Sequence, residues 1–241
     1  MNTIGSDCFS IIVPTFREAN NISALVKRIA KVDFGARQFE LILMDDNSND
    51  GIADIVRNLQ PIYPWLRLII RTGKKGLSES VIEGFSHAQY PIWVIMDADL
   101  SHPPEKIPEM LTALAQPGVN IVIGSRYVEG GSSDDQWPLI RRVFSHFAAW
   151  AARVLVGVPV KDPLSGFVML KKETLIAGKK LEPIGWKIGL EIMVKCRCRH
   201  IQEVPIYFAQ RTQGASKLSL KVIINYLQHV HRLIWFKMFS I

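Results

Sequence analysis

The sequence predicts an α/β protein built on a Rossmann-like, mostly parallel sheet with helices on both faces. Three observations predict this fold class. Five apolar segments alternate with segments of helical periodicity in the first half of the chain, these apolar segments are continuous, and polar clusters follow three of them. Continuous apolar strands between helices are typical of a parallel sheet that is buried on both faces. The chain has 241 residues, of which 48% are hydrophobic, which is enough for one large α/β core.

Each expected strand is a short apolar run, and each expected helix carries apolar residues at a spacing of three or four. The expected strands are residues 9–13, 39–44, 66–70, 92–96 and 119–123. The expected helices are residues 20–32, 51–59, 77–88 and 105–115. Ligands of such sheets bind beyond the carboxyl ends of the strands, so the residues that directly follow a strand are candidates for a site.

The pattern changes after Gly124. The polar, glycine-rich segment 129–136 is expected to form a flexible loop. The later expected elements are a helix over 141–156, a turn at 162–167 ("DPLSGF"), a helix over 189–198 and a strand over 201–207. No repeat or linker separates two independent domains, so we expect one domain over residues 1–217, followed by an amphipathic helix over 218–241.

Charge and cysteine content narrow the functional classes. The net charge of +7 is compatible with an anionic partner, but Lys and Arg are spread along the chain, so no nucleic acid partner is expected. Cys8, Cys196 and Cys198 fit neither a disulfide framework nor a zinc site, and we expect free thiols in a cytoplasmic protein. Neither a signal peptide nor a membrane-spanning run of apolar residues is recognised.

Two aspartates, Asp97 and Asp99, follow the fourth expected strand. In an extended backbone these side chains point the same way and repel each other unless a cation lies between them. Mg²⁺ prefers oxygen ligands and is often held by one or two carboxylates together with substrate phosphates. The hypothesis is therefore a Mg²⁺ or Mn²⁺ ion that binds a nucleoside diphosphate. The alternative is a capped turn, because Asp is a common turn residue.

Polar residues also follow the first two expected strands. Asp45 and Asp46 end the second strand, where a carboxylate can accept hydrogen bonds from a nucleobase. The alternative is an Asx-turn that leads into the next helix. Pro14, Phe16 and Glu18 follow the first strand, and an apolar ring beside a carboxylate suits a nucleoside. Glu18 could equally be an acidic residue at the start of a helix.

The segments around these residues resemble those of family-two glycosyltransferases, and they are most similar to the dolichol-phosphate mannose synthase branch. In chain order they are "IIVPTFREANNI", "LILMDDNSNDG", "GLSESVIEGF", "VIMDADLSHPP", "IVIGSRY", "DPLSGF" and "QGASKL", and they cover roughly residues 9–217. The resemblance implies a GT-A fold and a metal-dependent, inverting transfer of a hexose. The implied donor is a nucleoside diphosphate sugar, GDP-mannose in the nearest branch, and the implied acceptor is a polyprenyl monophosphate such as dolichol phosphate.

The resemblance also implies roles for single residues. Those matching the nucleotide-sugar site are Pro14, Phe16, Glu18, Asp46, Ala98, Arg211 and Lys217. Those matching the catalytic and metal-binding group are Asp97, Asp99, Ser101, Arg126 and Arg141. The two arginines are expected on phosphates, because the planar guanidinium suits phosphate oxygens. Ser101 stands where many relatives carry Gln, so we expect it to reach a metal through water.

Arg211 and Lys217 flank Gly214, and this segment is expected to fold over the site as a flap. The turn that holds Asp162, Ser165 and Gly166 matches a family turn near the reacting sugar. Two departures leave the identity of the sugar open. Val168 stands where relatives commonly carry Arg, and Arg17 stands where they favour Asn.

The acceptor sets the expected mechanism. A phosphate monoester is already an anion near pH 7, so its oxygen can attack the anomeric carbon without a general base from the protein. The enzyme is then expected to act by positioning its substrates and by stabilising the leaving diphosphate. His87, His102 and His146 are accordingly expected to be structural or to support the residues that contact the ligands.

A polyprenyl phosphate lies in a membrane, and two stretches of the chain could reach one. They are the apolar segment 143–156 and the tail from Leu218, in which Lys221, Arg232 and Lys237 accompany apolar residues. This composition fits a helix that lies in the membrane interface, at the cytoplasmic face. The alternatives are a helix packed on the sheet or a contact with another subunit.

Other enzymes use some of the same residue patterns. The nearest is a UDP-sugar transferase of the glucose type in the same family. An aspartyl-nucleophile phosphatase could also use two aspartates one residue apart. A dinucleotide oxidoreductase does not fit, because the first strand leads into "PTFREAN" and not into Gly-x-Gly-x-x-Gly.

Overall fold

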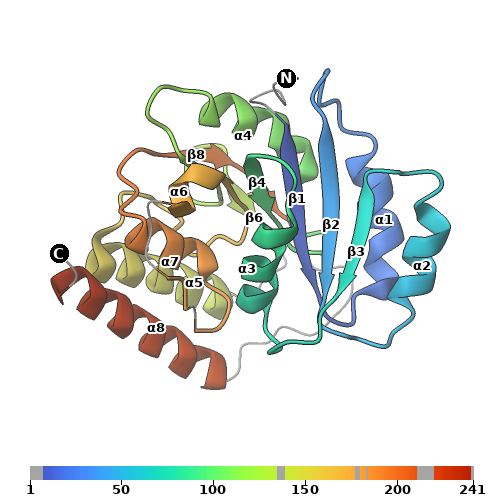
Figure 1. Ribbon diagram of the computed structural model, residues 1–241. Helices are drawn as coiled ribbons and strands as arrows, with labels where there is room; N and C mark the ends of the chain where they lie inside the picture. The colour runs from blue at the N-terminus through green and yellow to red at the C-terminus, as the bar shows by residue number, and fades with distance from the viewer. Residues whose placement is uncertain (1–7, 135–138, 177–179, 183, 211–219, 240–241) are drawn as a thin grey trace.

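Within the described residues, seven strands form one sheet in the order β3-β2-β1-β4-β7-β5-β8, with helices on both faces (Figure 1). The computed structural model of the protein describes residues 8–134, 139–176, 180–182, 184–210 and 220–239. The strands of the sheet are β1 (Phe9–Thr15), β2 (Phe39–Asp45), β3 (Leu66–Ile70), β4 (Ile92–Ile95), β5 (Ile121–Ser125), β7 (Val168–Lys171) and β8 (Ile201–Pro205). The predicted α/β class with a mostly parallel sheet is confirmed.

The helices include two irregular turns, η1 and η2. They are α1 (Ala19–Ile29), α2 (Ile52–Leu59), α3 (Leu77–His87), η1 (Pro104–Lys106), α4 (Ile107–Leu114), α5 (Leu139–Ala152), the π-helical η2 (Arg153–Gly157), α6 (Lys172–Ile176), α7 (Ile188–Lys195) and α8 (Leu220–Phe239). Two short strands, β6 (Ser132–Ser133) and β9 (Tyr207–Phe208), pair with each other in a second sheet.

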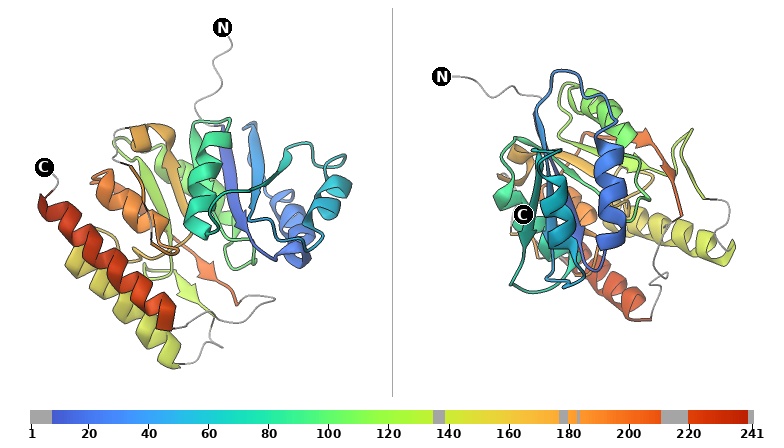
Figure 2. Two further views of the ribbon diagram at one scale, coloured as in Figure 1. Left: turned by 60° about the horizontal axis from the view of Figure 1, so that its bottom comes forward. Right: turned by 90° about the vertical axis from the view of Figure 1, so that its right-hand side faces the viewer.

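Each face of the large sheet has its own apolar core. Helices α1, α2 and α4 cover one face, where Ile22 and Leu25 of α1 are fully buried. Helices α3, α5, α7 and α8 contribute to the other core, where Val230 and Leu233 anchor α8 (Figure 2). Because both faces are covered, continuous apolar strands are what the fold requires, and this is the pattern that the sequence carries.

Strand β7 lies in the middle of the sheet, and the sequence analysis missed it. It runs antiparallel between β4 and β5, with Val94 opposite Met169 and Ile123 opposite Val168. Its four residues follow the "DPLSGF" turn directly, with no helix between the turn and the strand. The alternation of strands and helices that predicted the other strands is therefore missing here. Val168, the departure from the family pattern, is 1% exposed and belongs to the core.

Several expected elements in the second half differ from those observed. The expected flexible loop at 129–136 contains β6, because the Ser132 N–H donates to the Ile206 carbonyl. The expected strand 201–207 ends at Pro205, and β9 begins after Ile206. The expected helix 189–198 ends at Lys195, since Arg197 has a φ of +51° and cannot continue a right-handed helix.

The cysteines are free thiols, as predicted. Burial raises the pKa of Cys196 to about 11, assisted by Glu191, and burial raises the pKa of Cys198 to about 12, assisted by Cys196. The thiolate is the reactive form, so a raised pKa keeps both side chains protonated and slow to react at pH 8.

We therefore expect iodoacetamide to modify Cys196 about 100-fold more slowly in the native protein than in urea, with the rate rising as the pH approaches 11. Peptide mass spectrometry measures the rate for each cysteine. Equal rates in the native and unfolded protein would contradict the assigned environment.

Candidate active site

A cavity of about 300 Å³ lies at the carboxyl ends of β1, β2 and β4. Its lining residues are Pro14, Thr15, Phe16, Glu18, Asp46, Lys75, Gly76, Leu77, Ser80, Asp97, Ala98, Asp99 and Trp186. The three polar clusters that follow the first, second and fourth strands therefore meet around one cavity. The parallel register of β1 with β2 and β4 brings them together.

Asp97 and Asp99 lie on a tight turn after β4, which ends at Ile95. The backbone N–H and the hydroxyl of Ser101 both donate to Asp99 Oδ1, with an N–O distance of 3.1 Å for the first. Leu100 has a φ of +65°, which a turn of this tightness requires. The backbone is thus not extended here, yet both carboxylates line the same cavity. The two aspartates therefore lie on a turn, as in the alternative, and also line the cavity; their predicted contact with a metal stays a prediction.

His102 holds this turn through a hydrogen bond to the backbone of Asp97. Its Nδ1 accepts a hydrogen bond of 2.9 Å from the Asp97 N–H, and its ring stacks on Phe167 at 5.3 Å. Burial lowers the pKa of His102, although Asp97 and Asp99 oppose this effect. The neutral ring is the form that can accept at Nδ1, so His102 is structural, as expected. Gly166 packs beside it, where a Cβ would lie 3.2 Å from His102 Cε1.

The acidic turn suits a divalent metal that is shared with a ligand. Asp97 and Asp99 offer the hard carboxylate oxygens that Mg²⁺ and Mn²⁺ prefer. Among the described residues, no group of three or more His, Cys, Asp or Glu side chains could hold a metal alone. Phosphate oxygens or water would have to complete the coordination, as is common for Mg²⁺. Ser101 donates to Asp99 and does not line the cavity, so its direct effect is to orient Asp99; its predicted contact with a metal through water stays a prediction.

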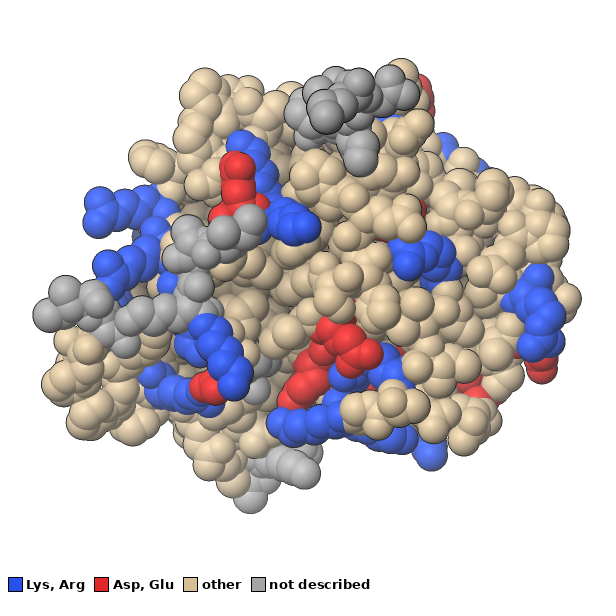
Figure 3. All heavy atoms as spheres, in the orientation of Figure 1, with Lys and Arg blue, Asp and Glu red and all other residues tan. Residues whose placement is uncertain are grey.

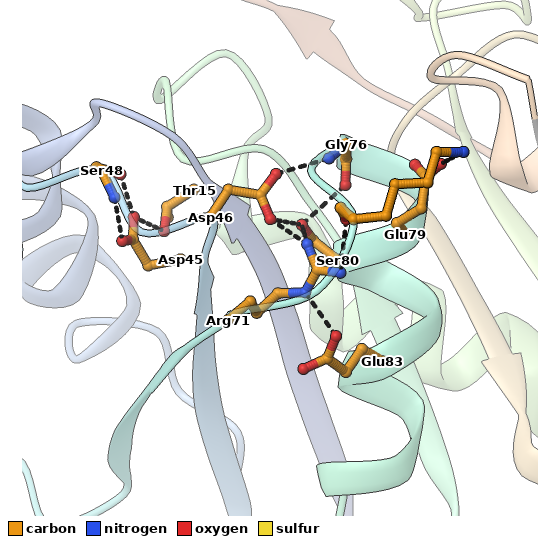
Figure 4. Close-up of polar contacts among 10 residues, drawn as sticks. Thr15, Asp45, Asp46, Ser48, Arg71, Gly76, Glu79, Ser80 and Glu83 are labelled. Carbon is orange, nitrogen blue, oxygen red and sulfur yellow. Dashed lines mark hydrogen bonds and ion pairs between the residues drawn. The ribbon is translucent and has the colours of Figure 1, made fainter.

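Asp46 anchors the loop that leads into α3 (Figure 4). Its Oδ1 accepts hydrogen bonds from Arg71 Nη1 and from the Ser80 hydroxyl, the second at 3.0 Å, and its Oδ2 accepts from the Gly76 N–H at 2.8 Å. Arg71 also donates to Glu83 Oε2 at 2.9 Å. Asp46 therefore shapes the wall of the cavity through Gly76 and Ser80. Its predicted contact with a nucleobase stays a prediction.

Asp45 is bound within the loop that follows β2, but to the residue three positions on, so it does not form the Asx-turn that is the alternative for this pair. Its Oδ2 accepts from the Ser48 N–H at 2.8 Å, and its Oδ1 accepts from the Thr15 hydroxyl at 3.1 Å. The side chain is 1% exposed and does not line the cavity. Of the two adjacent aspartates, only Asp46 reaches the site.

Phe16 and Glu18 form the wall that follows β1. The Phe16 ring is 40% exposed, with Lys75 Nζ 5.2 Å from its centroid. Glu18 stands at the N-terminal end of α1 and accepts a hydrogen bond of 2.6 Å from Asn21 Nδ2. Arg17, between them, has a φ of +61°, a region that Asn adopts more readily than Arg. This backbone conformation would suit Asn, the residue that the resemblance implies at that position.

Arg126 forms a buried ion pair with Asp162 instead of facing the cavity. Its Nε and Nη2 donate to the two Asp162 oxygens at 2.7 and 2.8 Å. Burial by itself would lower the pKa of Arg126, but the adjacent Asp162 carboxylate overrides this effect and raises it. The guanidinium thereby fixes the turn at residues 162–167 against β5. Its predicted contact with phosphate stays a prediction.

The other predicted cations lie outside the described side chains. Arg141 falls within α5, but its side chain is not described. Arg211, Gly214 and Lys217 belong to residues 211–219, which lie outside the described residues. Their predicted roles at phosphates and in a flap stay predictions.

Sequence reasoning missed Lys75, Leu77, Ser80 and Trp186 as cavity residues. The first three lie in "KGLSES", which follows β3, so the rule for residues beyond strand ends could have found them. Trp186 lies between α6 and α7, far from any parallel strand end in sequence. Only the fold brings it to the cavity, where it is 37% exposed.

Comparisons with known sequences agree with the motifs. Residues 10–175 match the family model described as Glycosyl transferase family 2. The chain is 42% identical over 226 residues to a dolichol-phosphate mannosyltransferase of Pyrococcus furiosus; the match covers 93% of this chain and 63% of that relative. It is 40% identical over 238 residues to the dolichol-phosphate mannosyltransferase of Saccharomyces cerevisiae, covering 95% of this chain and 88% of the relative.

Solved structures share the fold at lower identity. A glucosyl-3-phosphoglycerate synthase of Mycobacterium tuberculosis in complex with phosphoglyceric acid superposes with a TM-score of 0.65 at 19% identity, over 93% of this chain and 80% of that one. A mannosyltransferase of Pyrobaculum calidifontis in complex with GDP-Man and Mn²⁺ gives a TM-score of 0.64 at 19% identity, over 93% and 62%. At this identity the likeness concerns the fold, and the predicted GT-A fold is confirmed.

Proposed function

The chain belongs to glycosyl transferase family 2, and on that premise we propose that it is a metal-dependent, inverting mannosyltransferase. The donor is GDP-mannose and the acceptor is a polyprenyl monophosphate such as dolichyl phosphate. One observation carries the proposal: two carboxylates and an exposed aromatic ring line one cavity at the carboxyl edge of the sheet. The substrates follow from relatives about 40% identical that are named dolichol-phosphate mannosyltransferases.

Different residues of the cavity would bind different parts of the donor. Phe16 offers a ring on which a nucleobase can stack, and Lys75 lies beside it as a cation for the phosphates. Asp46 holds the cavity wall at Gly76. Asp97 and Asp99 would hold a Mg²⁺ or Mn²⁺ ion, which would offset the negative charge that builds on the departing diphosphate.

The acceptor phosphate supplies the nucleophile. No histidine lines the cavity within the described residues, and the one closest to the acidic turn, His102, is committed to the Asp97 N–H. The phosphate oxygen needs no proton removed near pH 7, so the protein acts by holding the two substrates in line. Attack from the face opposite the diphosphate inverts the anomeric carbon.

A thermal-shift panel tests the donor. GDP-mannose and UDP-glucose are each added with Mg²⁺, with Mn²⁺ or with a chelator. At about 100 times its Kd, a donor that binds the folded state stabilises it by about 2.7 kcal/mol, which raises the Tm by roughly 5–10 °C. We expect this shift for GDP-mannose with metal. A larger shift for UDP-glucose would favour the glucose-type transferase, and a phosphoenzyme without sugar transfer would favour the phosphatase.

The acceptor also implies a membrane surface, and α5, η2 and α8 offer one. Helices α5 and α8 lie side by side (Figure 2), joined by a hydrogen bond of 2.7 Å from the Tyr226 hydroxyl to the Ala148 carbonyl. Their outer faces expose large apolar side chains: Val143, Phe147, Trp150, Val154, Leu155, Ile223, Ile224, Leu227, Trp235, Met238 and Phe239. Many exposed large apolar side chains on two neighbouring helices are typical of an interaction site. No helix in the described ranges is both long and apolar enough to span a bilayer.

We expect the double variant Trp150→Gln/Leu227→Gln to bind phosphatidylcholine vesicles about fifty-fold more weakly than the unmodified protein, because two exposed apolar side chains no longer enter the bilayer. Co-sedimentation measures the binding. The matched control is Ile62→Gln/Ile70→Gln, which removes two exposed apolar side chains on the side of β3 and α2. Equal binding by both variants would rule out this surface. The free thiols support a cytoplasmic location for that membrane face.

A further inference from the structure

A second cavity, of about 510 Å³, lies at the other edge of the sheet and has no part in the proposed reaction. It is bounded by η2, by the end of α7 and by the end of α8. Arg199, in its wall, lies two residues before β8 begins, which is the amino-terminal edge of the parallel strands. The active-site cavity lies at the carboxyl edge. A volume of this size falls within the range of small-molecule sites, about 300–1,000 Å³.

The inner wall of this cavity is apolar. Val156, Val158, Met193, Val194 and Phe236 contribute to it, and the first four are each less than 9% exposed. A site with such walls accepts hydrocarbon, since water in contact with apolar side chains is readily displaced.

The remaining wall of the same cavity is cationic. Arg197, Arg199 and Lys237 line it, and all three residues are exposed to solvent. Lys237 Nζ donates to the Val156 carbonyl at 3.0 Å, which fixes its ammonium group at the end of η2. Segments 153–161, 192–201 and 233–239, which build the site, contain no Asp or Glu. The charge of the cavity therefore complements an anion.

The surroundings of the cavity decide what kind of anion fits. Val154 and Leu155 lie in η2 directly before its cavity residues, and Trp235, Met238 and Phe239 flank the cavity residues of α8; each of the five is at least 50% exposed. Figure 3, in the orientation of Figure 1, shows Lys and Arg side chains at the left edge of the molecule, near the C-terminal end of α8. Exposed apolar side chains next to cations are the arrangement of a helix that lies in a membrane interface, with its cations at the headgroups.

We infer that this cavity binds one anionic phospholipid of the bilayer, with an acyl chain against the valine wall and the phosphate on Arg197, Arg199 and Lys237. This site is distinct from the acceptor phosphate site, because it lies at the opposite edge of the sheet. It rests on the proposed membrane docking and adds to it a lipid preference. The bound lipid would hold the C-terminal end of α8 at the membrane while the carboxyl edge carries out the reaction.

Vesicle binding tests the lipid preference. Each basic residue near an anionic bilayer contributes about five-fold to partition, so Arg197→Gln/Arg199→Gln is expected to lower binding to vesicles that contain phosphatidylglycerol by about 25-fold. Binding to pure phosphatidylcholine vesicles should not change. The matched control, Lys27→Gln/Lys31→Gln, removes two exposed cations from α1 and from the turn that follows it, on the other face of the sheet, and should change binding to both kinds of vesicle by less than about two-fold. Equal losses for the two double variants would overturn the site.

A soluble probe separates a cavity from a charged surface. Short-chain phosphatidylglycerol, kept below its micelle concentration, is expected to raise the Tm of the unmodified protein but not that of Arg197→Gln/Arg199→Gln. Inorganic phosphate and short-chain phosphatidylcholine at the same concentration should leave the Tm unchanged. If only inorganic phosphate raises the Tm, or if neither lipid does, the inference is wrong. The cavity would then be a candidate site for a protein partner.

The rate of mannose transfer is measured in a separate assay in detergent, with GDP-mannose and a short-chain polyprenyl monophosphate as substrates. Both double variants should keep the turnover of the unmodified protein, since neither pair lines the active-site cavity. If the unmodified protein transfers no mannose, the proposed function fails while the lipid measurements still stand. If the protein transfers mannose but shows no preference for the anionic lipid, the inferred lipid site is wrong and the proposed function still holds.

Discussion

Asp162→Asn is expected to lower the free energy of unfolding by about 3–5 kcal/mol. The Asp162 side chain is fully buried and accepts three hydrogen bonds from Arg126, two from the guanidinium and one of 3.1 Å from the backbone N–H. The Arg126 side chain is only 11% exposed, and its raised pKa keeps it charged at any accessible pH. The amide in place of the carboxylate would leave that charge buried without a counter-ion. Removing one partner of a buried ion pair destabilises a protein more than removing both partners.

Urea unfolding measures the loss. The control is the double variant Arg126→Met/Asp162→Asn, which removes both charges while the Asn oxygen can still accept from the backbone N–H of residue 126, and it should recover most of the stability because no unpaired charge stays buried. A second control, Asp54→Asn, breaks an exposed pair with Arg57 in α2, and it should cost less than about 1 kcal/mol. If Asp162→Asn changes stability as little as Asp54→Asn does, the ion pair does not hold the turn.

Asp99→Asn is expected to lower mannose transfer by about 1,000-fold or more while the protein stays folded. The carboxylate of Asp99 is 4% exposed, lines the cavity and is oriented by Ser101. Asn keeps the volume of the side chain and removes its charge, so the loss reports the electrostatic stabilisation of the leaving diphosphate. The thermal shift caused by GDP-mannose should lose its dependence on metal in the same variant.

A radiometric transfer assay and the thermal-shift panel measure the two effects. Asp54→Asn serves again as the control, since it removes one exposed carboxylate far from the cavity and should keep full activity. An Asp99→Asn protein with full activity would show that the metal is bound elsewhere. A loss of activity with an unchanged metal-dependent shift would assign Asp99 to the substrate instead of the metal.

The location of the cavity, which is the candidate site, was predictable because it depends on few choices. Parallel strands place their carboxyl ends at one edge, so the residues after β1, β2 and β4 were expected there, and they meet because these three strands are neighbours in the sheet. Pro14, Phe16, Glu18, Asp46 and Asp97 were found in this way and do line the cavity. The continuous apolar strands likewise required a sheet covered on both faces.

Partners that lie far apart in the sequence were not predictable. Arg126 was expected on a phosphate, but the fold places Asp162, 36 residues away, against its guanidinium. Trp186 reaches the cavity although no strand end precedes it. A side chain's chemistry says what it can bind, while the choice among many suitable partners depends on which segments pack together.

The amino-acid sequence alone was enough to predict the fold class, the edge of the sheet where the cavity lies and several residues of the cavity wall, because hydrophobic periodicity and strand direction are local properties of the chain. The tertiary structure decided that β7 enters the sheet antiparallel, that Arg126 is bound to Asp162, and that α5 and α8 leave an apolar face beside a second, cationic cavity. These features arise from contacts between distant segments, whose free energy depends on burial and geometry that exist only once the chain has folded.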